Sequence, residues 1–319
     1  MLRSILIFLS KAAWAQRLVV GWKFAWQAAH RFVAGNTIAD AIKAVRQLNT
    51  KGINATLDHL GESTSTREEA VKAADEVIEL LDQIHVSGVN ANVSVKLTQI
   101  GLALDESQCA KNLERILVRA SEYKNFVRID MEDTPYTDQT INMYREMRRK
   151  GFENTGVVVQ SYLYRTEKDT RELLGEGAIF RLVKGAYKEP PELAFPKKAD
   201  VDANFDMLTQ IVIDASKVAG SPTLSADGRI PPILAVGSHD PKRLDFARTY
   251  SEKVSLPKQA IEFQMLFGIR RDLQEHFVKE GYPVRIYVPY GTHWYPYFMR
   301  RLAERPANIW FFVSNFFRK

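Results

Sequence analysis

From residue 37 onward, short apolar runs alternate with charged segments of helical periodicity, and this alternation constrains the fold more than any other feature. Strands that alternate with helices are typical of a parallel sheet with helical crossovers. Eight runs have the length and composition of strands: Ile53–Asp58, Ala91–Lys96, Phe126–Asp130, Gly156–Gln160, Ala178–Val183, Ile233–Val236, Ala260–Gln264 and Val284–Val288. The helical segments between them include Arg67–Gln83, Gln108–Glu122, Thr137–Lys150 and Val201–Val218.

Eight such units in a chain of 319 residues favour an α/β fold of the TIM type, a distorted (βα)8 barrel, over an open doubly wound sheet. A dinucleotide-binding open sheet carries a glycine-rich turn after its first strand, and neither G-x-G-x-x-G nor G-x-x-x-x-G-K-[ST] occurs here. We expect an N-terminal helical arm over residues 1–50 and a barrel over residues 51–319. Within the arm, Asn36-Thr37 can cap a helix that stops near Gly52.

The arm concentrates the positive charge of the chain. The formal net charge is +6, and no acidic residue precedes Asp40. Basic and aromatic residues are mixed in this stretch: Arg3, Lys11, Arg17, Lys23 and Arg31 with Phe8, Trp14, Trp22, Phe24, Trp26 and Phe32. Such a mixture favours contact with a membrane surface, and an arm packed on the barrel is an equally good interpretation.

Other features bear on the compartment and on metals. The apolar run Ile5–Leu9 is shorter than a signal peptide or a membrane-spanning helix requires, so we expect a cytoplasmic protein, with peripheral contact at the inner face of the membrane left open. Cys109 is the single cysteine, which excludes an intrachain disulfide. The six histidines show no short metal-ligand spacing, and we expect no metal site.

Polar residues close most of the predicted strands. In a TIM-type barrel the reactive groups lie at the carboxyl ends of the strands. These groups form an electropositive, hydrogen-bonding mouth that suits an anionic ligand. They are Lys96, Asp130, Gln160, Arg181 with Lys184, Ser238 with His239, Gln264, and Tyr287.

The segment after the last strand adds a cationic fork. If the chain is helical from Pro296, then Tyr297, Arg300, Arg301 and Glu304 share one face. Two adjacent guanidiniums beside a tyrosine suit a small carboxylate, and Glu304 would orient Arg300. A surface ion pair between Arg300 and Glu304 is the simpler interpretation of the helix in isolation. Its place above a mouth lined by Lys96 favours the carboxylate site.

Several motifs occur in a family order: VSVKLTQIG with Lys96, VRIDMED with Asp130, VVVQSY with Gln160, RLVKGAY from Arg181, GSHD with His239, EFQMLFG with Leu266, RIYVPYG with Tyr287, and the closing Tyr297, Arg300, Arg301 and Glu304. From about residue 40 to 310 the chain resembles the proline dehydrogenase family, in its monofunctional bacterial form. Ser238 departs from the threonine expected before the histidine, and it keeps the hydroxyl.

This resemblance implies flavin-dependent oxidation of L-proline to Δ1-pyrroline-5-carboxylate, by hydride transfer from C5 to flavin N5. FAD is the expected flavin, with FMN left open, and a membrane quinone is the expected electron acceptor. Asp130 and Arg181 would be catalytic. The substrate would be bound by Lys96, Leu266, Tyr287, Tyr297, Arg300 and Arg301. The flavin would be bound by Met131, Gln160, Arg181, Val183, Lys184, Gly185, Ala186, Ser238, His239 and Glu304.

Two other functions stay open at this point. A Schiff-base aldolase would use Lys184, which follows a predicted strand, or Lys96 as its reactive amine. A nucleic-acid-binding module would rest on the net charge without any recognised motif, so we expect no nucleic-acid partner. The loop Lys188–Lys198, after the fifth strand, is either an active-site lid or a long surface connection.

Overall fold

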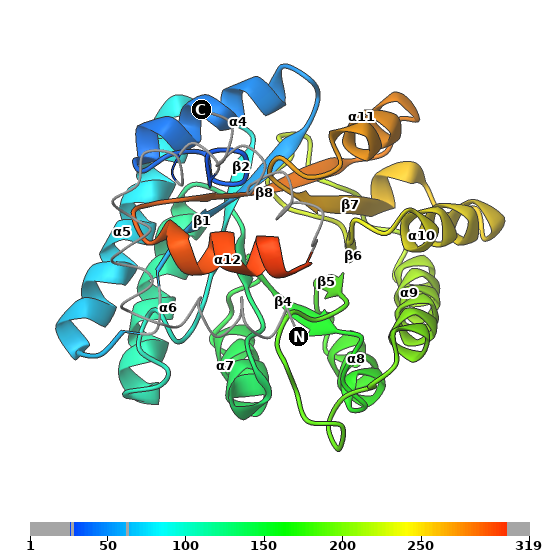
Figure 1. Ribbon diagram of the computed structural model, residues 1–319, viewed down its shortest axis with the longest axis horizontal. Coiled ribbons are helices and arrows are strands. Elements are labelled where there is room, and N and C mark those ends of the chain that lie inside the picture. The colour runs from blue at the N-terminus through cyan, green and yellow to red at the C-terminus, as the bar shows by residue number, and fades with distance from the viewer. Residues whose placement is uncertain (1–25, 27–28, 62–63, 305–319) are drawn as a thin grey trace, which may run out of the picture.

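The computed structural model describes residue 26, residues 29–61 and residues 64–304, and it shows a closed barrel of eight parallel strands (Figure 1). Each strand pairs with the next in sequence, and β8 pairs with β1. The (βα)8 barrel and all eight predicted strands are confirmed. The strands are β1 (Asn54–His59), β2 (Ala91–Val95), β3 (Val127–Ile129), β4 (Thr155–Gln160), β5 (Phe180–Val183), β6 (Leu234–Gly237), β7 (Ile261–Leu266) and β8 (Val284–Tyr290).

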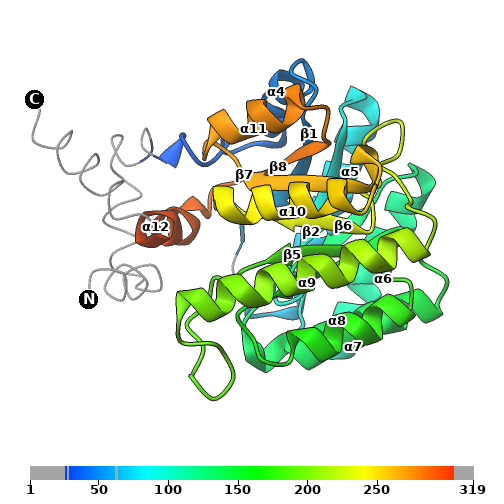
Figure 2. The ribbon, with the colours of Figure 1, turned by 90° about the vertical axis from the view of Figure 1, so that its right-hand side faces the viewer.

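Helices surround the barrel, and the last of them lies across one of its ends (Figure 2). They are α4 (Ile38–Asn49), α5 (Arg67–Ser87), α6 (Glu106–Glu122), α7 (Thr137–Arg149), α8 (Thr166–Gly175), α9 (Lys198–Val218), α10 (Pro241–Lys253), α11 (Arg271–Lys279) and α12 (Trp294–Glu304), with short 3₁₀ turns at Thr134–Tyr136 and Lys258–Ala260. Helix α5 shows how sequence sets such an element. Thr66 and Glu69 form a capping box at its start, and Gly88 ends it in the left-handed conformation.

Helix α4 begins after the predicted cap, because the Thr37 side chain accepts a hydrogen bond from the backbone of Asp40. The helix packs on β1 and β8. The basic arm before residue 26 and the aromatic tail after residue 304 lie outside the described residues, and the domain division at residue 50 stays a prediction. In the described part of the chain, no helix combines the length and apolar character that crossing a membrane requires.

The inside of the barrel is polar. The loop that contains Gly228 closes the end of the barrel at which the strands begin. Asn92 on β2 and Arg285 on β8 donate hydrogen bonds to the carbonyls of Arg229 and Gly228. Gly228 has φ +69°, and a Cβ there would lie 2.2 Å from Oδ1 of Asn54. Glycine is therefore required for this loop to approach the barrel so closely.

Helix α12 lies across the other end, where β8 stops at Tyr290 (Figure 2). The helix predicted from Pro296 is confirmed, and it starts two residues earlier, at Trp294. Pro296 therefore occupies the first turn, where its missing N–H breaks no helical hydrogen bond. The helix buries Trp294, Tyr295, Phe298 and Leu302 in an apolar cluster that also contains Phe32 and Val33.

The loop after β5 is tied to the barrel. Thr134 donates hydrogen bonds to Glu189 from its backbone nitrogen and its hydroxyl. Leu163 and Ala194 form an isolated antiparallel bridge. These contacts anchor the first half of the predicted lid, and its role as a lid stays a prediction.

Candidate active site

A cavity of about 500 Å³ opens at the carboxyl ends of the strands, beneath α12. It brings together predicted residues from β2–β8 and α12: Lys96, Asp130, Met131, Gln160, Arg181, Val183, Lys184, Gly185, Ala186, Ser238, His239, Leu266, Tyr287, Tyr297, Arg300 and Arg301. Glu304 belongs to the last turn of α12, and its side chain lies outside the described residues. The side chains predicted at the ends of the strands therefore lie together in one cavity.

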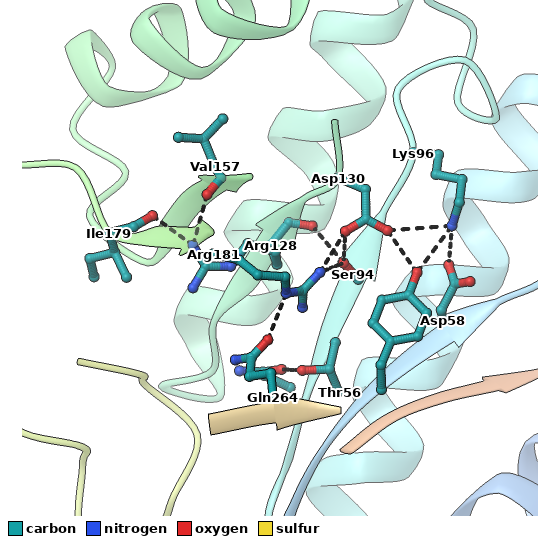
Figure 3. Close-up of polar contacts among 12 residues, drawn as sticks. Thr56, Asp58, Ser94, Lys96, Arg128, Asp130, Val157, Ile179, Arg181 and Gln264 are labelled. Carbon is teal, nitrogen blue, oxygen red and sulfur yellow. Dashed lines mark hydrogen bonds and ion pairs between the residues drawn. The ribbon is translucent and has the colours of Figure 1, made fainter. Parts of the chain in front are cut away.

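Asp130, the residue after β3, is the centre of the polar network (Figure 3). Its Oδ1 accepts hydrogen bonds from Arg181 Nη1 at 2.7 Å and from Ser94 Oγ at 2.6 Å. Its Oδ2 accepts from the Tyr287 hydroxyl at 2.7 Å. Burial disfavours the carboxylate, but Lys96 and Arg181 outweigh burial and hold the pKa of Asp130 below its ordinary value. Asp130 is therefore ionised at neutral pH.

Lys96 lies between two carboxylates. Its Nζ is 2.8 Å from Oδ1 of Asp58 and 3.4 Å from Oδ2 of Asp130. Burial disfavours the ammonium, but the two aspartates prevail and raise the pKa of Lys96. Together with Arg181, this makes a buried set of two cations and two anions. Opposite charges offset part of the cost of burying these groups, although burial still raises the pKa of Asp58 above its ordinary value.

Asp58 and Tyr187 also line the cavity and are not among the predicted site residues. Asp58 closes the predicted strand Ile53–Asp58, so the strand-end rule that selected Lys96 and Asp130 could have found it. Tyr187 ends the motif that begins at Arg181. Burial, helped by the charge of Glu132, raises the pKa of Tyr187 to about 12, so its phenol is protonated at neutral pH.

Two cationic side chains of α12 reach the cavity. Arg301 is 9% exposed, and its guanidinium carbon lies 5.0 Å from the centre of the Tyr297 ring. Stacking on an aromatic ring fixes the plane of a guanidinium. Arg300 also lines the cavity and is more exposed. The predicted arrangement of both arginines and Tyr297 on the inner face is present.

The part of the cavity formed by β4–β7 carries a different set of groups. Lys184 Nζ lies 2.5 Å from Asp202 and 2.7 Å from Asp240. His239 Nε2 accepts a hydrogen bond from the Leu266 backbone at 2.9 Å, which leaves its Nδ1–H as the ring's donor. Gly185 has φ +115°, and a Cβ there would meet the Tyr162 ring at 2.4 Å. The backbone can therefore follow this path only with glycine at position 185.

Comparison with known proteins gives one consistent result. The family model described as proline dehydrogenase matches residues 41–313. The chain belongs to the proline dehydrogenase family. Proline dehydrogenase 2 of Bacillus subtilis is 38% identical over 99% of both chains, and proline dehydrogenase 1 of the same strain is 39% identical over the full length of both. Proline dehydrogenase of Deinococcus radiodurans is 40% identical over 91% of this chain and 90% of its own.

A solved structure agrees with this family. Proline utilization A (PutA) of Bdellovibrio bacteriovorus, inactivated by N-propargylglycine, superposes with a TM-score of 0.79 at 25% identity. The match covers 92% of this chain and 34% of that protein. As a member of the proline dehydrogenase family, the chain is an enzyme that oxidises proline in proline catabolism.

Proposed function

We propose that this chain oxidises L-proline to Δ1-pyrroline-5-carboxylate with a bound flavin, FAD being the form we favour over FMN. The observation that carries the proposal is the cavity in which the Asp130–Arg181–Lys96–Tyr287 network faces the arginines of α12. One side of the cavity thus offers cations to a carboxylate. The other side offers backbone and side-chain donors to a larger polar group.

The residues of the β4–β7 side fit a flavin. Gly185 brings the backbone close to the Tyr162 ring, and Val183 on β5 and Met131, which follows β3, add apolar surface to the cavity. Gln160, Lys184, Ala186, Ser238 and His239 supply polar side chains and backbone groups along the same side. The bound flavin would supply the oxidising chemistry by accepting a hydride at N5 from C5 of proline. The residues of this chain orient the substrate and stabilise the charge that develops during the reaction.

Arg300 and Arg301 bind the proline carboxylate, with Lys96 as the third cation. Leu266, Tyr287 and Tyr297 enclose the methylenes of the ring, and Tyr287 leaves little room for a 4-hydroxyl group. This arrangement holds the substrate in one orientation, which lowers the entropic part of the barrier. Arg181 stabilises the negative charge that develops on reduction. Asp130 is catalytic in that it holds Arg181 and Tyr287 in place.

The aldolase interpretation is disfavoured by the contacts of its proposed amine. A Schiff base forms from a free amine, whereas Lys184 is ion-paired with both Asp202 and Asp240. Lys96 is ion-paired in the same way with Asp58 and Asp130.

The deciding experiment is an anaerobic titration of the purified protein with L-proline, followed by the visible spectrum. We expect a yellow protein whose flavin bands bleach, and N-propargylglycine should inactivate it. Flavin bands that ignore proline would contradict the substrate. A protein that stays colourless after reconstitution with FAD and with FMN would contradict the cofactor, and borohydride trapping of a carbonyl substrate would then test Lys184.

We further propose that the electrons pass to a membrane quinone, and that the basic, aromatic arm holds a cytoplasmic enzyme at the inner face of the membrane. Deleting residues 1–35 would confuse the test, because Phe32 and Val33 pack against α12. Replacing Arg3, Lys11 and Arg17 with glutamine avoids this difficulty. The variant should bind anionic liposomes less tightly and bleach normally with proline. Unchanged liposome binding would contradict the membrane role.

A further inference from the structure

A fully buried ion pair lies in the barrel below the cavity. Arg285 on β8 donates from Nε to Oε1 of Glu262 at 2.8 Å and from Nη2 to Oε2 at 3.0 Å. Glu262 is 0% exposed and Arg285 is 1% exposed, and neither lines the cavity. A buried ion pair is often no more stabilising than apolar residues of equal volume. Stability is therefore a weak reason for its presence.

Gln264 links this pair to the active site. Its Nε2 donates to Oε1 of Glu262 at 2.5 Å. Its Oε1 accepts from Arg181 Nε at 2.6 Å, a contact that Figure 3 shows. An ionised carboxylate can only accept hydrogen bonds, so the amide nitrogen must face Glu262. The amide oxygen then has to face Arg181. Glu262 and Arg181 thus require the same orientation of the Gln264 amide, and Glu262 holds the nitrogen end of that amide in place.

The Arg181 guanidinium lies over the Tyr287 ring, with its carbon 5.2 Å from the ring centre, and it donates hydrogen bonds from two of its edges. Its Nε donates to Gln264, and its Nη1 donates to Asp130 at 2.7 Å. Two hydrogen bonds from different atoms of a planar group fix its plane as well as its position. Without Gln264 the group would keep Asp130, the longer contact to Ser94 at 3.4 Å and the Tyr287 ring, but its Nε edge would no longer be held.

We propose that Glu262 is a positioning residue that acts through Gln264 to fix the orientation of Arg181. The proposal rests on the function proposed above, in which Arg181 stabilises negative charge on the reduced flavin. Glu262 touches neither substrate nor cofactor in this scheme. Its carboxylate orients the amide, and the oriented amide orients the guanidinium.

The test uses the full-length flavin-loaded protein with Glu262→Gln, Gln264→Met and both together. The readouts are the midpoint potential of the flavin, the single-turnover rate of flavin reduction by proline, and the dissociation constant for proline. We expect the flavin of each single variant to be reduced by proline about tenfold more slowly, with unchanged proline binding. This effect is smaller than the loss of a direct oxyanion donor. The double variant should be no slower than the single ones, because both changes interrupt one chain of contacts.

The sign of the change in the flavin midpoint potential distinguishes a positioning role of Glu262 from a simple effect of its charge. Removing a negative charge near the flavin would by itself make the potential more positive. Loss of the Arg181 orientation makes the reduced flavin less stable and the potential more negative. Gln264→Met changes no charge and should shift the potential in the same negative direction as Glu262→Gln.

Asp169→Asn is the matched control, because Asp169 is a buried carboxylate on α8, paired with Arg165 at 2.6 Å and outside the cavity lining. It should leave potential and rate unchanged. Wild-type values in both folded variants, or rate effects that multiply in the double variant, would overturn the proposal. If Glu262→Gln fails to fold, Gln264→Met decides the question. A wild-type protein that does not bleach with proline would overturn the proposed function itself.

Discussion

The phenol of Tyr287 donates a hydrogen bond to Oδ2 of Asp130 at 2.7 Å, although the two residues are 157 positions apart in the sequence. The same phenol oxygen lies 3.1 Å from Nζ of Lys96. Burial and the neighbouring charge of Asp130 keep the pKa of Tyr287 well above its ordinary value. Tyr287 is therefore a neutral donor throughout the physiological pH range. Its ring lines the cavity, and its hydroxyl contacts the charged groups of Asp130 and Lys96.

Tyr287→Phe should lower the free energy of unfolding by about 1–2 kcal/mol, because a buried carboxylate oxygen loses a donor. Proline oxidation should slow as Asp130 becomes less well held. Urea unfolding and steady-state kinetics measure the two effects. Tyr250→Phe is the matched control, since its hydroxyl also contacts an aspartate, Asp214, but at the surface. Equal stability losses in the two variants would contradict the importance of the buried contact.

Arg301→Lys should raise the KM for proline by roughly 10- to 100-fold, because an ammonium cannot reproduce the planar fork that stacks on Tyr297. The flavin content should stay at the wild-type level, since Arg301 belongs to the α12 side of the cavity. Steady-state kinetics and the visible spectrum check both statements. Arg271→Lys, an exposed position on α11, should behave as wild type. An unchanged KM would remove Arg301 from the substrate site.

Gly185→Ala should weaken flavin binding and destabilise the fold by more than about 2 kcal/mol. The strain of a positive φ costs about 1–2 kcal/mol for an L-residue, and the clash with the Tyr162 ring adds to it. Gly220→Ala provides the comparison, with φ +82° and nothing within 4 Å of the added Cβ. Thermal unfolding and flavin titration distinguish them. Similar losses of flavin affinity in both variants would show that the close approach at position 185 has no special role.

The titration of Asp206 makes the free energy of unfolding depend on pH. Burial raises its pKa to about 6, against the attraction of Arg243. Asp202, Lys184 and Asp240 act on it as well. The folded chain therefore binds this proton more tightly than the unfolded chain, whose aspartate has its ordinary pKa of 3.8. The stability that results is complete below pH 3.8 and is lost as the pH rises through about 6.

Asp206→Asn removes this titration. We expect the difference in unfolding free energy, wild type minus variant, to decrease between pH 4 and pH 7. Urea unfolding at several pH values measures it. A difference that stays constant, or that grows with pH, would contradict a raised pKa.

The sequence predicted the elements and the rim of the site well, because both depend on local patterns. A parallel strand buried on both sides is a short apolar run, and the residue that ends it must lie at the mouth. Lys96, Asp130 and Arg181 were found in this way. The pairing of Arg181 with Asp130 was beyond such reasoning, because β4 separates β3 from β5 and the contact depends on closure of the barrel.

The contacts below the cavity could not be predicted from the sequence, for the same reason. Glu262 and Gln264 are two residues apart on β7, so they share one face of the strand. That Gln264 meets Arg181 from β5 and that Glu262 meets Arg285 from β8 follows from three-dimensional register alone. Ser238 shows the reverse case. It replaces an expected threonine, and its hydroxyl accepts a hydrogen bond from the backbone of Asp240, a role that either residue can fill.

The position of α12 has a consequence for how the enzyme is made. Its arginines follow all eight strands in the sequence, and the helix rests on Phe32 and Val33, which leave the ribosome early. A chain grows from its N-terminus, so the groups around Asp130 and Arg181 exist before either arginine has been synthesised. A product cut short after β8 would retain every residue proposed to hold the flavin except Glu304, and it would lack Tyr297, Arg300 and Arg301 of the proposed proline site. The two arginines proposed to bind the substrate carboxylate are thus among the last parts of the site that a growing chain acquires.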